Sequence, residues 1–156
     1  MTVLQGGRAK AYRPLPVAAR ADAVRAGLAA YERGDVFLAH ELLEPAWMGT
    51  ADIAERELVQ GLIKLAAGFV HAARGNPTGV TKNLVGARDH LVAAGRHGSS
   101  GPVGPGSTTV APIAVPELAA INVAQLVAAI DRVVLRVARS GEVPHRRPAI
   151  RHRTGS

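Results

Sequence analysis

The sequence predicts an all-α fold: a compact multi-helical bundle of about five helices, built from two stacked helical hairpins plus a C-terminal helix. Apolar residues recur every three or four positions over most of the chain, which places them on one face of a helix. No segment shows convincing strand alternation. The apolar fraction is 47% but the aromatic fraction is only 3%, and small side chains fill a core only where helix backbones approach closely.

Helix stop and start signals divide the first part of the chain into four helices. Gly34 can adopt the left-handed conformation that ends a helix, and Asp35 is suited to cap the next one. Asp52 and Glu55 resemble a capping box, and the Gly-Asn-Pro run at 75–77 again combines a stop with a start. The expected helices are residues 17–33, 36–48, 52–74 and 78–94.

The C-terminal part is predicted to add one more helix, which Pro116 opens and Gly141 closes. Its apolar stripe consists of Leu118, Ile121, Leu126, Ile130, Val133 and Val137. The expected organisation is a basic N-terminal arm (1–16), a four-helix core (17–95), a flexible Gly/Ser/Pro linker (96–115), a C-terminal helix packed on the core (116–140) and a basic, disordered tail (141–156).

The net charge of +7 lies in the two ends of the chain, because residues 1–13 carry +3 and residues 139–156 carry +4. The neutral body argues against specific nucleic-acid binding, although the arginine-rich tails could bind polyanions weakly. Cysteine is absent, so disulfides and thiolate metal sites are excluded. No apolar stretch has the features of a signal peptide or a membrane span, and we expect a cytoplasmic protein.

The most informative segment is His-Glu-Leu-Leu-Glu-Pro-Ala-Trp at residues 40–47. Residues advance by about 100° along a helix, so His40, Glu44 and Trp47 fall on one side of it, with Glu41 at the edge. Leucine and alanine cover the other sides, and a helix that is apolar on most sides is expected to be buried. The segment therefore predicts a buried His/Glu/Trp pocket.

Buried charged groups need partners, and the next expected helix offers them. Gln60, Lys64 and His71 are spaced by four and seven residues, which places them on one face, and Glu57 lies near the start of the same helix. Packed against the histidine and glutamate of the preceding helix, this face would form the second wall of the pocket, with the tryptophan as a lid or platform.

Three chemistries could use these residues. His40 and Glu44 are the minimum for general acid/base catalysis, they could instead bind a divalent metal, and Lys64 with the imidazoles could bind an anion. The zinc-protease pattern His-Glu-x-x-His is not matched, because Glu44 replaces its second histidine. We therefore assign no metal and no other cofactor, and take His40 and Glu44 as catalytic. The predicted ligand-binding residues are Glu41, Trp47, Gln60, Lys64 and His71.

Two further expectations concern the same helices. Pro45 cannot donate a hydrogen bond to the carbonyl of Glu41 and disfavours helical geometry at Glu44, so the helix should kink or restart there. His90 and His97 are expected to be surface residues of the fourth helix and its end.

These residues resemble a family of uncharacterised proteins known as domain of unknown function 309. The His-x-x-x-Glu-x-x-Trp motif of the family is matched by His40, Glu44 and Trp47, with Glu41 in its usual companion position. The following helix and the Arg-Gly-Asn turn after it are also similar. The resemblance covers roughly residues 20–95 and implies a compact multi-helical fold and a cytoplasmic protein, but no activity.

The functional expectation is a cytoplasmic helical protein whose pocket carries out acid/base chemistry, as a hydrolase or lyase, on an unknown small ligand. The alternative is a non-enzymatic interaction module, in which the His/Glu/Trp set is a structural network and the arginine-rich tails bind an acidic protein partner. The long apolar last helix is compatible with a homodimer. No membrane partner and no specific nucleic-acid partner are expected.

Overall fold

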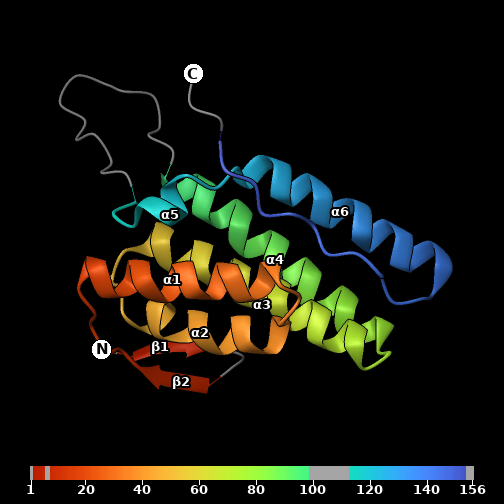
Figure 1. Ribbon diagram of the computed structural model, residues 1–156, viewed down its shortest axis with the longest axis horizontal. Helices are drawn as coiled ribbons and strands as arrows, with labels where there is room; N and C mark the ends of the chain where they lie inside the picture. Colours follow the sequence, from red (N-terminus) through yellow and green to blue (C-terminus); the bar gives the residue numbers. More distant parts are fainter. Residues whose placement is uncertain (1, 6–7, 99–112, 154–156) are drawn as a thin grey trace.

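The structure, a computed structural model, describes residues 2–5, 8–98 and 113–153, and it confirms the all-α bundle. The helices of these ranges are α1 (Val17–Glu32), α2 (Val36–Met48), α3 (Ile53–Ala73), α4 (Pro77–Gly98), α5 (Pro116–Ala119) and α6 (Val123–Ser140). Contacts run from α1 to α2, from α2 to α3, from α3 to α4 and from α4 to α6, and α5 contacts α1 and α3. Figure 1 shows α6 alongside α4 at the upper side of the bundle.

The N-terminal arm contains the one departure from helix that the sequence did not predict. Strands β1 (Thr2–Gln5) and β2 (Arg8–Ala11) pair antiparallel, and Figure 1 draws this hairpin at the lower edge of the molecule. The strands are too short to show a clear alternation of apolar and polar residues.

The predicted stop and start residues form the helix ends. The glycines with positive φ are Gly34, Gly75 and Gly141, at 89°, 69° and 70°. The Asp35 side chain accepts a hydrogen bond from the backbone N–H of Leu38 at 3.2 Å, and the Asp52 side chain accepts one from that of Glu55 at 2.8 Å. Because these signals act within one turn of the chain, the sequence located the ends of the first three helices and the start of the fourth to within one residue. The fourth helix ends at Gly98, four residues beyond the expected end.

Helices α3 and α4 approach through glycines. A Cβ atom added to Gly61 would lie 2.8 Å from the Leu91 side chain, and one added to Gly68 would lie 2.8 Å from the Leu84 side chain. Both leucines are fully buried. The scarcity of aromatic residues is thus matched by close backbone packing, as the composition predicted.

The expected single helix 116–140 is divided in two, which corrects the prediction. Asn122 separates α5 from α6: its side chain accepts a hydrogen bond from the Gln125 N–H at 3.1 Å, and its own N–H donates to the Arg151 carbonyl at 2.8 Å. Asparagine prefers an N-cap to a helix interior, which accounts for the break. All six residues of the predicted apolar stripe are buried.

The expectation of a disordered tail is wrong for residues 142–153, which run back along α6 (Figure 1). Ile121 and His152 form an antiparallel bridge, and the Tyr31 hydroxyl donates to the Pro148 carbonyl at 2.6 Å. Pro148 is buried, and Val143 packs on the core, so apolar burial and these hydrogen bonds offset the entropy of ordering the segment.

Two other expectations concern the predicted linker and membrane spans. Residues 99–112 of the predicted linker lie outside the described residues. Among the helices that the structure does describe, none combines the length and apolar character needed to cross a membrane.

The contact between Tyr31 and the tail gives a testable prediction. Burial raises the pKa of the Tyr31 phenol, so it stays protonated and donates its hydrogen bond at neutral pH. Tyr31→Phe should lower the free energy of unfolding in urea by about 1–2 kcal/mol, because the Pro148 carbonyl loses its donor. Tyr12→Phe, at a less buried tyrosine, is the control. Equal effects of the two variants would contradict a structural role for the contact.

Candidate functional site

Helix α2 presents its histidine and its two glutamates on a partly exposed side. The residues that bury the helix against α1 and α3 are Ala39, Leu43, Ala46 and Trp47. The side chain of His40 is 30% exposed and that of Glu41 is 53% exposed, and Glu44 is half-buried. The prediction of a fully buried pocket was therefore wrong, because the apolar residues between the polar ones make the core contacts.

Helix α2 continues through Pro45 to Met48, so the helix does not restart there. The chain before α1 completes the end of the helix: the Arg13 N–H donates to the Met48 carbonyl and the Leu15 N–H donates to the Gly49 carbonyl, both at 3.0 Å. Trp47 lies at this end of α2 and is only 2% exposed. It is a core residue and not the lid that the sequence suggested.

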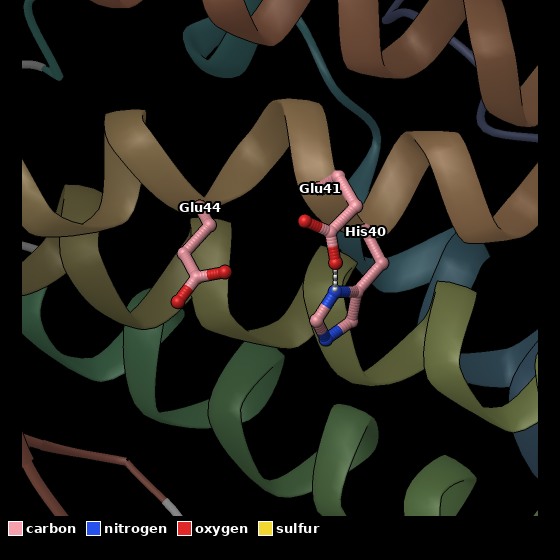
Figure 2. A group of neighbouring side chains, drawn as sticks. All are labelled: His40, Glu41 and Glu44. Carbon is pink, nitrogen blue, oxygen red and sulfur yellow. Dashed lines mark ion pairs between the residues drawn. The ribbon is translucent and has the colours of Figure 1, made fainter.

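His40, Glu41 and Glu44 form a cluster of potential metal ligands on one side of α2 (Figure 2). One ligand atom from each of the three side chains lies within 4.8 Å of the other two. Among the described residues, no second group of three or more His, Cys, Asp or Glu side chains is arranged in this way.

The distance between His40 and Glu41 bears on which chemistry the cluster suits. His40 Nδ1 and Glu41 Oε1 are 3.6 Å apart, which is longer than a hydrogen bond. With zinc bonds of about 2.0–2.1 Å, two ligand atoms of a tetrahedral site are about 3.4 Å apart. The observed spacing therefore fits two ligands of one metal ion better than an imidazole oriented by a carboxylate.

The predicted second wall of the pocket faces α4. A Cβ atom added to Gly86 of α4 would lie 3.7 Å from Lys64 Cδ, and His71 Nδ1 lies 3.2 Å from Asn76 Nδ2 at the α3–α4 turn. Within the described residues, neither Lys64 nor His71 forms a hydrogen bond or ion pair with His40. The structure thus does not join these residues to His40 in the way that the sequence suggested.

The other two polar residues considered on α3 are Glu57 and Gln60. Glu57 Oε2 lies 2.6 Å from Nδ1 of His90 on α4, so His90 has a partner that the sequence did not reveal. Gln60 is 5% exposed, and its Oε1 atom has no hydrogen-bond partner. Neither arrangement includes His40, Glu41 or Glu44, so the candidate site is confined to the cluster on α2.

A neutral imidazole and two carboxylates supply the nitrogen and oxygen ligands that divalent transition metals accept. Three protein ligands leave a fourth tetrahedral position for water or substrate, which distinguishes catalytic zinc sites from closed structural ones. If these three side chains held a metal ion, the exposure of Glu41 and His40 would leave a fourth position open to solvent.

The comparison with protein families matches part of this chain. Residues 24–83 match the model of a family described as "Domain of unknown function (DUF309)". The resemblance stated from the sequence is therefore confirmed over α2, α3 and parts of α1 and α4, while α5, α6 and the tail lie outside the match. No curated protein and no solved structure matches the chain.

Proposed function

We propose that α2 binds a divalent transition metal ion through His40, Glu41 and Glu44, and that the bound ion activates water for a hydrolytic reaction. The observation that carries this proposal is the convergence of three ligand atoms within 4.8 Å. His40 and Glu44 lie at positions i and i+4 on one face of α2, and Glu41, next to His40 in the chain, places its carboxylate near the imidazole.

The metal site extends the acid/base chemistry expected from the sequence. An accessible metal ion with an open position lowers the pKa of its bound water and supplies hydroxide near neutral pH. In this proposal His40 and Glu44 act through the metal ion, and no direct proton transfer between them is required. Such a site does not require His40 and Glu44 to form hydrogen bonds with Lys64 or His71.

The test is titration calorimetry of the metal-free full chain with Zn²⁺. We expect saturable binding with one ion per chain, and we expect His40→Ala and Glu44→Gln each to weaken it by more than about tenfold. The matched controls are His97→Ala and Glu32→Gln, which change exposed residues outside the cluster and should leave the affinity unchanged. Co²⁺, with visible absorption that depends on coordination number, reports whether the site is four-coordinate.

Two outcomes would overturn the proposal. One is the absence of saturable Zn²⁺ binding, and the other is an affinity that His40→Ala and His97→Ala reduce equally. Melting temperatures in the presence of a chelator separate the structural alternative. If His40→Ala costs several kcal/mol without metal, the residue is part of a structural network; an unchanged melting temperature supports a functional site.

A further inference from the structure

A second candidate site lies between α6 and the tail, outside the family match. The structure has a pocket of about 250 Å³ there. The arginines that line it are Arg132 and Arg136 on α6 and Arg146, Arg147 and Arg151 on the tail. No lining residue is acidic, so the pocket concentrates positive charge.

The arginines of this pocket have no carboxylate partners, in contrast to two other arginines of the protein. Arg20 pairs with Glu55, and Arg88 pairs with Asp131. Within the ranges that the structure describes, no ion pair involves an arginine of the pocket. Like charges held together repel one another, and a bound anion would relieve that repulsion.

The backbone of the tail is fixed where it carries the arginines. The Arg151 carbonyl accepts a hydrogen bond from the Asn122 N–H at 2.8 Å, and the neighbouring Pro148 carbonyl is held by Tyr31. The Arg147 guanidinium lies 5.7 Å from the centre of the Tyr31 ring. The backbone that carries the tail arginines is therefore held in place, which lowers the entropy lost when a ligand binds.

We propose that this pocket binds an oligophosphate anion, a ligand with several linked phosphate groups. Guanidinium groups bind phosphate oxygens through paired hydrogen bonds, and several arginines in one pocket match several linked phosphates. The volume of about 250 Å³ is below the range of about 300–1,000 Å³ for drug-sized ligands, so the pocket suits a small ligand such as a short chain of phosphates. No aromatic side chain lines the pocket, which disfavours single-stranded nucleic acid, because that ligand stacks its bases on aromatic rings.

The test is titration calorimetry of the full chain with inorganic tripolyphosphate and with a nucleoside triphosphate, at about 0.15 M salt. We expect saturable binding that Arg132→Gln/Arg136→Gln weakens at least tenfold. Both arginines are exposed, so this variant should keep its fold and melting temperature. The control is Arg74→Gln/Lys82→Gln, which removes the same charge from exposed positions outside the pocket and should change the affinity less than twofold.

The two phosphate ligands distinguish the sources of the anion. Equal affinities mean that recognition is confined to the phosphates, and tighter binding of the nucleoside triphosphate means that base or sugar adds contacts; both results support the pocket. Equal weakening by the control and the pocket variant would overturn the proposal, because net charge alone would then explain binding. Binding of duplex RNA without binding of either oligophosphate would overturn it as well.

Discussion

Arg20→Met is expected to lower the free energy of unfolding by about 3–5 kcal/mol, because it leaves a buried carboxylate without its partner. Arg20 Nε lies 2.9 Å from Oε2 of Glu55, and the two side chains are 13% and 2% exposed. Arg20 also donates to the Leu15 carbonyl at 2.5 Å, so it links the segment before α1 to the start of α3. Urea denaturation followed by circular dichroism measures the change.

Two controls separate the buried charge from the loss of side-chain packing. Arg20→Met/Glu55→Met removes both charges and should recover much of the lost stability, since replacing a whole buried pair by apolar residues is often close to neutral. Arg25→Met affects an exposed pair with Glu117 and should leave the melting temperature nearly unchanged. If Arg20→Met behaves like Arg25→Met, the pair does not contribute as inferred.

Gly61→Ala is expected to destabilise the protein by about 1–3 kcal/mol, although alanine is the better helix former. The added Cβ atom would lie 2.8 Å from the Leu91 side chain and 3.2 Å from the carbonyl oxygen of Ala87. Leu91 is fully buried, so it has no free space into which to move. Either α3 and α4 separate or the leucine leaves its preferred rotamer, and thermal unfolding reports the cost.

Gly95→Ala is the matched substitution on α4. A Cβ atom added to Gly95 meets nothing within 4 Å, so the gain in helix propensity should stabilise the protein by about 0.5–1 kcal/mol. Opposite signs for Gly61→Ala and Gly95→Ala would show that interhelical distance, and not glycine content, controls stability. A stabilising effect of Gly61→Ala would contradict the close approach of α3 and α4.

The fold was largely predictable because its helix ends are encoded locally. Gly34 and Asp35 lie side by side in the sequence and act within one turn of it. The break at Asn122 was missed because the apolar stripe continues across it. One local signal was present: the step from Ile121 to Leu126 is five residues, longer than the three or four of a continuous helical face.

The tail was not predictable from local pattern. The Tyr31 hydroxyl and the Pro148 carbonyl are separated by 117 residues, and no periodicity within residues 142–153 indicates which surface they cover. The arginine pocket was missed for the same reason, since Arg132 and Arg146 belong to segments whose pairing depends on the tertiary fold. Pro148 and Ile150 were the apolar residues near these arginines that could have suggested that the tail packs on the helices.

The candidate metal cluster could be predicted only in part. The proximity of His40 and Glu44 follows from their spacing of four residues on α2, whereas the approach of the Glu41 carboxylate to His40 depends on side-chain conformation. The partners proposed on α3 depended on which face of that helix meets α2. Gly61 and Gly68 place their backbones against α4. Lys64 and His71 lie on the same side of α3 and are therefore directed toward α4.

The contact between Tyr31 and Pro148 also sets an order of events during synthesis. The two residues are 117 positions apart, and at about 5–20 residues per second the ribosome needs roughly 6–23 s to connect them. During that interval α1 has no tail to cover Tyr31, while the neighbouring α3–α4 pair can already form. Tyr31 therefore lacks its hydrogen-bond partner until Pro148 has been synthesised, and the arginine pocket cannot form before Arg151 has been added.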